Sequence, residues 1–231
     1  MSRGIACLLS VFWVLTSFSQ NVETDSLLPS LKHAPDLKYR EDQFYFGVTH
    51  SMLQDKPSGF SPRTLSLGVQ FGFLRDFPIN AKRTLAVAPG IGYSYFNLHN
   101  NLAVSSDEKF VVMDSYNRNA QNRYYLDFPL ELRWRTSTPE DHKFWRVYLG
   151  VKASYLLRNK NNTSDDLTTS YAQKNMINLN KWTYSMYMAA GFNTWNIYLS
   201  YGLNTIYKDN LFAEDSNKLR YFNAGLMFYI L

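Results

Sequence analysis

Charged side chains recur at alternate positions between Tyr124 and Arg135, where they could pair or exchange protons. Successive side chains of a β-strand point to opposite faces, so these charges share one face of an extended strand. Basic residues at alternate positions of the next stretch, 144 to 157, would face them. Unpaired charges away from water are very costly, so we expect a structural ion network, with a functional site as the alternative. Its expected members are Asp127, Glu131, Arg133, Arg135, Arg146 and Lys152.

Other residues offer little chemistry. Gly90-Ile91-Gly92 lacks the third glycine of a dinucleotide-binding fingerprint and lies inside an alternating stretch. The histidines fall in different segments without metal-ligand spacing and are interpreted as solvated: His33, His50, His99 and His142. No nucleophile, base and orienting acid can be assembled, so we predict a protein that is not an enzyme and has no cofactor or metal.

The opposite face of the 124 to 135 stretch is apolar, with Tyr124, Leu126, Phe128, Leu130, Leu132 and Trp134. Such alternation indicates a strand with one apolar and one polar face. The pattern recurs, and we count eight segments. Their predicted ranges are 43 to 53, 64 to 74, 84 to 97, 123 to 136, 144 to 157, 182 to 193, 195 to 207 and 219 to 230.

The amino-terminal segment has the features of a secretory leader. A short positive start precedes an apolar run from Gly4 to Leu15, and Ser17-Phe18-Ser19 offers a cleavage site. We predict a signal peptide at 1–19, a periplasmic segment at 20–42 and one β-domain at 43–231. The apolar run is shorter than the roughly 20 residues of a spanning helix. Cys7 is the only cysteine, so the mature chain has none for a disulfide.

The composition favours a membrane barrel. Aromatic residues make up 16% of the chain, although its mean hydropathy is −0.31. An exported polar chain this rich in aromatic residues is typical of transmembrane β-barrels, whose strands expose apolar side chains only at alternate positions. The net charge of +5 comes from scattered basic residues, so we expect no nucleic-acid partner. We predict an all-β fold: an eight-stranded antiparallel up-and-down barrel in the outer membrane.

Connection lengths and aromatic residues predict the orientation. Loops near 54 to 63, 98 to 122, 158 to 181 and 208 to 218 are expected outside the cell, and short turns near 75 to 83, 137 to 143 and 193 to 194 in the periplasm. Interface anchors are expected at Trp134, Trp145 and Trp195 on the turn side and at Trp182 on the loop side. Tyr93, Tyr124, Tyr155 and Tyr207 are expected to join Trp182.

The inward face of the predicted barrel is small or polar. Glycine and alanine alternate there with larger residues such as Tyr148, Tyr187 and Tyr198. An eight-stranded barrel is just wide enough for side chains to fill, so we expect a plugged lumen. Pro89 and Pro129 lie within strands, which demands bulges or unpaired positions there.

Two stretches resemble known barrels. The last strand, Asn223-Ala224-Gly225-Leu226-Met227-Phe228-Tyr229-Ile230-Leu231, resembles the carboxy-terminal signal of bacterial outer-membrane barrels. The strand at 125 to 135, with its embedded proline, precedes Tyr148-Leu149-Gly150 in the next strand. This arrangement resembles the PorT-like outer-membrane β-barrel family of the Bacteroidota, whose members are small porin-like barrels of OmpX or OmpA architecture.

The resemblance implies a role in type IX protein secretion or surface-protein assembly. A passive envelope or adhesion barrel is the alternative. A third hypothesis, a lipid A-modifying enzyme, would need a lipid-facing histidine beside a serine, and His50 and Ser51 are expected on opposite faces. The partners that we expect are outer-membrane lipid, lipopolysaccharide, and other envelope or secretion proteins.

Overall fold

The computed structural model describes residues 42–56, 59–62, 65–104, 110–112, 118–136, 145–164, 170–174, 179–208 and 218–230. These residues all belong to one compact unit, Pro35–Leu231. The predicted signal peptide at 1–19, nearly all of the 20–42 segment and the turn at 137 to 143 lie outside the described residues. Among the residues described, no helix is long and apolar enough to span a membrane.

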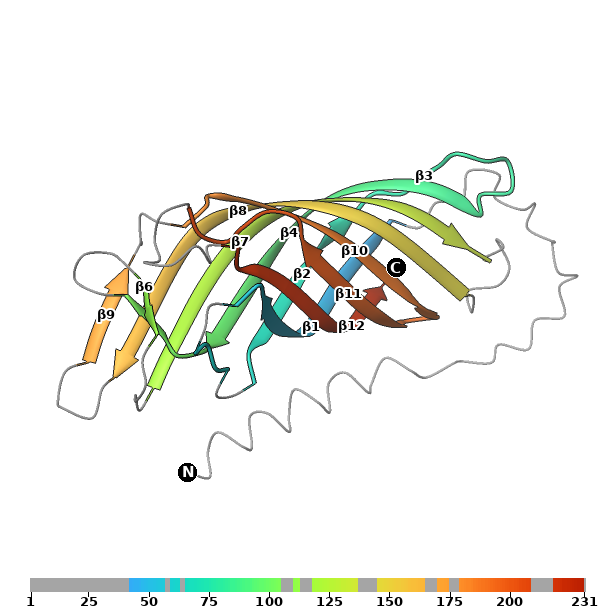
Figure 1. Cartoon of the computed structure of the whole chain (residues 1–231). Helices are drawn as coiled ribbons and strands as arrows, with labels where there is room; N and C mark the ends of the chain where they lie inside the picture. The colour runs from blue at the N-terminus through green and yellow to red at the C-terminus, as the bar shows by residue number, and fades with distance from the viewer. Residues whose placement is uncertain are drawn as a thin grey trace, which may run out of the picture. The chain divides into compact units, whose positions relative to one another are not determined.

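Eight antiparallel strands close into a barrel (Figure 1). They are β1 (Gln43–Gln54), β2 (Leu67–Leu74), β4 (Leu85–His99), β7 (Arg118–Arg135), β8 (Trp145–Ser164), β10 (Trp182–Phe192), β11 (Trp195–Gly202) and β12 (Arg220–Ile230). Each strand pairs with its neighbour in this order, and β1 pairs with β12, for example Val48 with Leu226. The fold class predicted from the sequence is confirmed, and each predicted segment overlaps one barrel strand.

Short strands occupy the connections. β3 (Phe77–Pro78) pairs with β4, β5 (Leu102–Val104) pairs with β6 (Phe110–Val112), and β9 (Ser170–Lys174) pairs with β8. We call the end that carries β5, β6 and β9 the loop end. The opposite end, with the Asn193-Thr194 turn and the segment 75–84, is the turn end.

β7 and β8 extend farther toward the loop end than their apolar pattern predicts. β7 begins at Arg118 and β8 continues to Ser164, and these two residues pair. The register shifts at Tyr124 and Tyr125, where Leu157 is the extra residue of a bulge on β8. Both strands run past their neighbours toward β9 in Figure 1. Beyond the bulge nearly all residues are polar, many of them amides, which explains why apolar alternation does not reveal the strands there.

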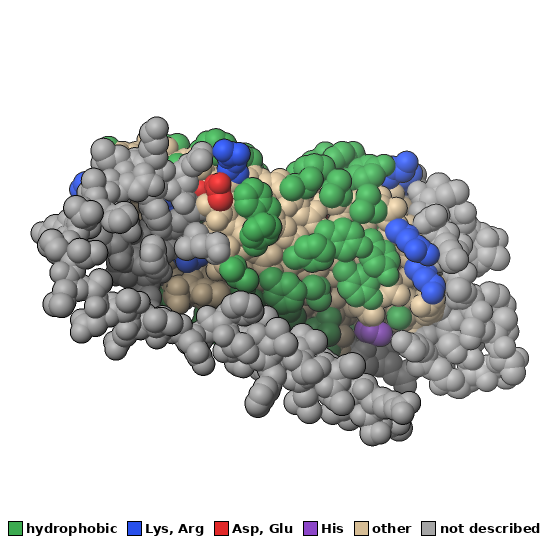
Figure 2. Space-filling model, turned by 180° about the vertical axis from the view of Figure 1, so that it is seen from behind, with side chains coloured by type: hydrophobic (Ala, Val, Ile, Leu, Met, Phe, Trp, Pro, Cys, Tyr) green, Lys and Arg blue, Asp and Glu red, His purple; other side chains and the backbone are tan. Residues whose placement is uncertain are grey.

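The barrel wall is apolar outside. The outward side chains include Phe44, Trp145, Trp195 and Ile197, each more than 60% exposed. Figure 2 shows hydrophobic side chains gathered over the middle of one face, with charged side chains toward its margins. Exposed apolar surface on this scale is costly in water, whereas lipid covers it at no such cost. The two-faced pattern of the sequence is therefore the pattern of a membrane-spanning wall.

The strand prolines interrupt pairing as expected. The register between β4 and β7 passes from Pro89 opposite Leu130 directly to Gly92 opposite Asp127. Proline has no backbone N–H to donate, so a gap beside Pro129 removes the need for a hydrogen bond that it cannot make. Pro89 faces outward and Pro129 faces the lumen.

Candidate functional site

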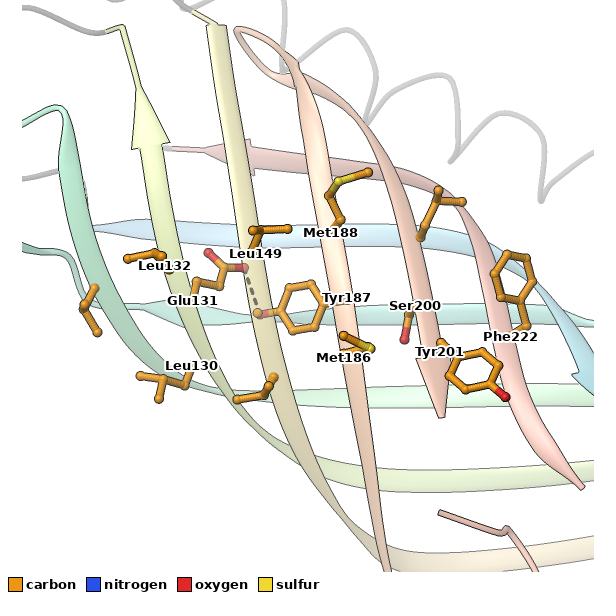
Figure 3. A pocket seen from close by; sticks show the side chains of 14 residues that line it. Leu130, Glu131, Leu132, Leu149, Met186, Tyr187, Met188, Ser200, Tyr201 and Phe222 are labelled. Carbon is orange, nitrogen blue, oxygen red and sulfur yellow. Dashed lines mark hydrogen bonds between the residues drawn. The ribbon is translucent and has the colours of Figure 1, made fainter. Parts of the chain in front are cut away.

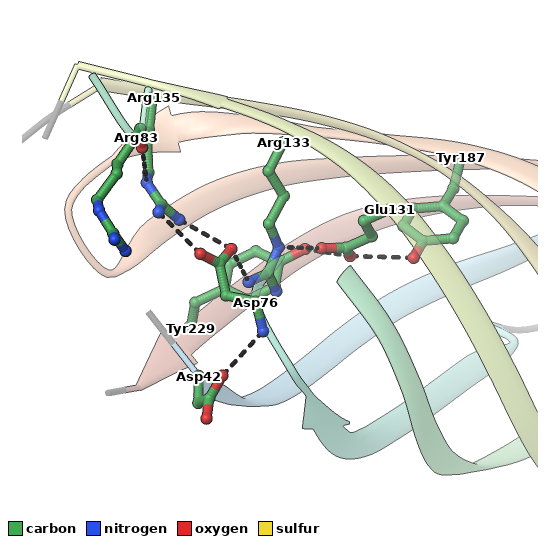
Figure 4. A network of polar contacts seen from close by, with 8 residues as sticks. All are labelled: Asp42, Asp76, Arg83, Glu131, Arg133, Arg135, Tyr187 and Tyr229. Atoms are coloured by element: carbon green, nitrogen blue, oxygen red, sulfur yellow. Dashed lines mark hydrogen bonds and ion pairs between the residues drawn. The ribbon is translucent and has the colours of Figure 1, made fainter. Parts of the chain in front are cut away.

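The turn end of the lumen holds a buried ion network centred on Asp76 (Figure 4). Arg135 donates two hydrogen bonds to the Asp76 carboxylate, Nη1 to Oδ1 at 2.9 Å and Nη2 to Oδ2 at 2.8 Å. Arg133 Nη1 donates to the same Oδ1 at 3.2 Å. All three side chains are fully buried. One carboxylate therefore compensates two guanidinium groups in a place without access to bulk water.

Glu131 extends this network into the lumen. Its Oε2 accepts from Arg133 Nε at 2.9 Å, and its Oε1 accepts from the Tyr187 and Tyr229 hydroxyls at 3.0 and 3.1 Å. The Arg133 guanidinium also lies 4.9 Å from the centre of the Tyr148 ring. Such cation–π contact further compensates a buried cation.

Glycines make room for these tyrosines. A Cβ atom on Gly150 would collide with the Tyr187 ring, and one on Gly92 would collide with the Tyr45 hydroxyl. Any larger residue at either position would push a ring out of the packed layer. Tyr45, Tyr148, Tyr187, Tyr198 and Tyr229 form this layer together with Leu74, Ala88, Ala189 and Met227.

A second, separate pair lies farther along the lumen. Lys152 Nζ is 3.4 Å from Asp127 Oδ2 and donates to Gln70 Oε1 at 3.0 Å. Ser154 Oγ donates to Asp127 Oδ1 at 2.6 Å. Both charged side chains are buried. Asp127 on β7 lies opposite Ser154 on β8. Lys152 is two residues from Ser154 and therefore on the same face of β8, which brings the acid and the base together.

Arg123 is the charged centre nearest the loop end. Its guanidinium donates to the hydroxyls of Tyr221 and Tyr207 and to Gln121 Oε1. The Tyr207 hydroxyl also donates to Gln121 Oε1 at 3.1 Å. Burial raises the pKa of Tyr207 above its ordinary value.

An apolar cluster closes the lumen at the loop end, next to these polar layers. The sequence predicts a small or polar inward face, so this cluster differs from the prediction. Segment 203–208 turns into the barrel mouth, where Ile206 N donates to Leu219 O and Asn180 N donates to Ile206 O. Tyr207 is 1% exposed, so its expected place among the interface anchors is wrong. We call the following cluster the lid: Leu53, Phe96, Leu98, Tyr125, Leu179, Ile206, Tyr207, Leu219 and Tyr221.

Five of the six residues expected in one ion network lie in two clusters. Glu131, Arg133 and Arg135 join Asp76, whereas Asp127 and Lys152 pair by themselves. Arg146 is buried and its guanidinium lies 5.8 and 5.7 Å from the ring centres of Tyr148 and Tyr229. The sequence analysis did not predict Asp76 as a member of the network. Asp76 lies in a predicted turn, where no alternating pattern indicates the direction of its side chain.

The four tryptophans expected as interface anchors all face outward. Trp134, Trp145 and Trp195 lie at the turn end, and Trp145 and Trp195 pack against Phe192 and Phe228 at 5.5 and 4.8 Å between ring centres. Trp182 lies toward the loop end, 5.1 Å from Tyr155. Their membrane depth is a prediction that rests on the preference of tryptophan for interfaces.

The outer wall carries an apolar groove of about 550 Å³ over β7, β8, β10 and β11 (Figure 3). Leu130, Leu132, Leu149, Met186 and Met188 line it, and Glu131 and Tyr187 form a hydrogen bond beneath it. On the lumen side of the wall, the Tyr187 ring lies against Gly150. The groove opens to the lipid-facing side of the barrel, where acyl chains fill such depressions.

The structure gives no support to a catalytic site at His50 and Ser51. His50 is half-buried, whereas the next residue, Ser51, faces the lumen and is buried. The two are therefore on opposite faces of β1, as the sequence predicts. Among the described residues, no group of three or more histidine, cysteine or acidic side chains is arranged to hold a metal ion.

A closed antiparallel barrel with an apolar exterior and a polar, filled interior is the structure of an outer-membrane protein. Comparison with known proteins agrees: residues 18–208 match the family described as "Outer membrane protein beta-barrel domain". The chain belongs to this family and is an outer-membrane protein. The match is to this broader family, and membership of the PorT-like group remains a prediction.

Two solved structures of an outer-membrane protein, Ail, are similar to the chain. The crystal structure of Ail, the attachment invasion locus protein of Yersinia pestis, is 12% identical, with a TM-score of 0.36, and the match covers 82% of this chain and 97% of Ail. The backbone structure of Ail in a phospholipid nanodisc is 13% identical, with a TM-score of 0.32, and the match covers 82% and 100% of the two chains. No curated protein matches the chain.

Proposed function

We propose that this protein is a non-enzymatic envelope or adhesion barrel that acts through contacts made by its loop end. The observation that carries the proposal is the combination of a filled lumen with strands that extend beyond the membrane-spanning wall. A barrel that does not conduct must act through its surface, and exposed loops on a rigid scaffold are where recognition usually resides.

The filled lumen argues against a conduit. The Asp76 network, the tyrosine layer, the Asp127–Lys152 pair and the lid follow one another along the interior. The small cavity lined by Lys152, Ser154 and Asn223 measures about 30 Å³, close to the volume that one water molecule occupies in the liquid. A solute would have to displace buried ion pairs to pass.

The extended strands supply the contact surface. Residues 118–123 of β7 pair with 159–164 of β8, and β9 adds a further strand. Asn122 and Lys160 are half-buried on one face of this extension, and Asn119, Gln121 and Asn161 are buried on the other. Backbone pairing holds Asn122 and Lys160 in fixed positions, so a partner that binds these side chains meets a preorganised surface. If the short turns face the periplasm, as in known barrels, this extension lies outside the cell.

A role in type IX secretion or surface-protein assembly is the second candidate. The observation in its favour is the sequence of β7 and β8, where Pro129 precedes the Tyr148-Leu149-Gly150 strand as in PorT-like barrels. Such a role would also be exerted through contacts. The two candidates differ in which process fails when the protein is removed.

The test is a strain that expresses a variant in which residues 160–174 are replaced by a short Gly/Ser linker. This change removes the outer part of β8 and β9 and keeps Leu179 and Asn180, which hold the lid. We expect normal insertion and loss of surface attachment or cell-to-cell contact to the level of a deletion strain. A control replaces Asn193-Thr194, at the turn end, with Asn-Gly.

The outcomes separate the hypotheses. Full attachment by the shortened variant contradicts a contact role of the extension. Accumulation of type IX cargo in the periplasm of the deletion strain supports the secretion role instead. A changed mass of lipid A in that strain supports the enzyme hypothesis, and we expect no change.

A further inference from the structure

A small cavity of about 30 Å³ lies in the lumen beneath the lid. We call it the lumen cavity. Phe96, Tyr125 and Tyr221 of the lid form its apolar side. Its polar side is built by side chains of four neighbouring strands: Lys152 of β8, Ser185 of β10, Ser200 of β11 and Asn223 of β12. The lumen cavity therefore lies between the lid and the polar layers of the interior.

The strand register places the polar side chains of the lumen cavity in pairs. Ser185 lies opposite Lys152, and Ser200 lies opposite Asn223. Gly202 also lines the cavity and lies opposite Ser185 on the other side. Because Gly202 has no side chain, its position contributes no atoms to fill the space beside Ser185. A small space with a polar lining is left among side chains that otherwise fill the lumen.

One oxygen atom in this lining has no hydrogen-bond partner. Asn223 is 7% exposed, and within the described part of the chain its Oδ1 accepts no hydrogen bond. Buried polar atoms without partners are rare in folded proteins, because losing water without gaining a hydrogen bond is costly. An unpartnered acceptor in the lining of a cavity indicates that the cavity takes a small molecule that donates a hydrogen bond.

Size and charge restrict this ligand to a small neutral molecule. The volume of about 30 Å³ is close to the share of one water molecule in the liquid. Lys152 is already paired with Asp127, at 3.4 Å between Nζ and Oδ2, so the charges beside the lumen cavity balance each other. A bound cation or anion would bring a charge that this buried pair does not compensate, which is costly away from water.

We propose that the lumen cavity binds one ordered water molecule. The water donates a hydrogen bond to Asn223 Oδ1 and accepts one from the Ser200 hydroxyl on the adjacent strand. Ser185 and Lys152 are further polar groups of the lining, and buried waters typically make about three hydrogen bonds. The water is thus a structural part of the filled lumen, between the Asp127–Lys152 pair and the lid.

The test is the electron density of the lumen cavity in a crystal structure of the protein extracted from membranes. We expect one peak at hydrogen-bond distance, about 2.7 to 3.2 Å, from both Asn223 Oδ1 and Ser200 Oγ. Asn223→Leu removes the acceptor with little change in volume, so the peak should be lost. The matched control is Ser51→Ala, because Ser51 lies opposite Asn223 on β1 but does not line the cavity. The peak should remain in this variant.

A second measurement does not depend on variants that fold. Magnetisation transfer from water to the Asn223 side-chain amide, measured by NMR in nanodiscs, should have the sign of a long-lived bound water. A wild-type cavity without density and without this transfer would overturn the proposal. So would a structure in which Asn223 Oδ1 accepts directly from the Ser51 hydroxyl, because the protein would then supply the donor. An unchanged peak in Asn223→Leu, or its loss in Ser51→Ala, would contradict the partners assigned to the water.

Discussion

Two arginines of β7 share one carboxylate at the turn end of the lumen. Asp76 contacts both Arg133 and Arg135, and all three are fully buried. Removing one partner of a buried ion pair leaves an uncompensated charge, which costs more than the pair contributes. We expect Asp76→Asn to lower the free energy of unfolding by about 3 to 5 kcal/mol. Urea unfolding in lipid vesicles measures this change.

The control for Asp76→Asn is Asp55→Asn. Asp55 is exposed and has a φ of 55°, a conformation that asparagine adopts readily. This variant should unfold at the wild-type urea concentration. An unchanged midpoint for Asp76→Asn would show that water reaches the carboxylate and that the network is not buried.

Glu131→Gln tests a milder loss in the same network. The glutamine can still accept hydrogen bonds from Tyr187 and Tyr229, but the charge opposite Arg133 is gone. Because Asp76 still compensates Arg133, we expect a smaller loss of stability than for Asp76→Asn, of the order of 1.5 to 3 kcal/mol. The same urea experiment ranks the two variants. A larger loss for Glu131→Gln would place the centre of the network at Glu131.

At the level of single residues, the sequence predicts which side chains face inward but not all of their partners. Asp127, Glu131, Arg133 and Arg135 alternate within a strand, so their common face follows from the period of the strand. Asp76 and Tyr207 lie outside strands, where direction depends on tertiary contacts. Alternation carries no information about such residues.

At the level of elements, barrel closure rests on the pairing of β1 with β12. Val48 lies opposite Leu226, and directly opposite residues of antiparallel strands have Cα atoms about 4.5 to 5.5 Å apart, within disulfide range. We expect Val48→Cys/Leu226→Cys to form a disulfide on mild oxidation in the membrane. A mobility shift on non-reducing gels measures it.

The matched control moves one cysteine along the same face of β12. Phe228 lies opposite Phe46, so Val48→Cys/Phe228→Cys should stay reduced under the same conditions. Efficient cross-linking of this second pair and not of the first would mean that the register differs by two residues.

The strand ranges that sequence predicts best are those within the apolar wall. β1, β10 and β12 lie close to their predicted limits because most of their outward residues are apolar. The outer parts of β7 and β8 carry amides on both faces, which removes the alternating signal. β11 ends at Gly202, and Ile206 and Tyr207 in the connection that follows it belong to the lid.

At the level of the whole molecule, the interior is filled from end to end by different kinds of contact. The turn end is ionic, the middle is built of tyrosines with one ion pair, and the loop end combines the apolar lid with the buried Arg123. An eight-stranded barrel has little room beyond its own side chains. The number of strands alone predicts a filled lumen. Segment 203–208, in the connection between β11 and β12, fills the lumen further at the loop end.

The central claim is that this outer-membrane barrel acts through its surface and not as a channel. Current across planar lipid bilayers containing the folded protein tests it most directly, with heat-dependent gel mobility as the check of folding. We predict no stepwise ion conductance, because passage would require breaking the Asp76 network and opening the lid. Stable single-channel currents from the folded protein would contradict the account.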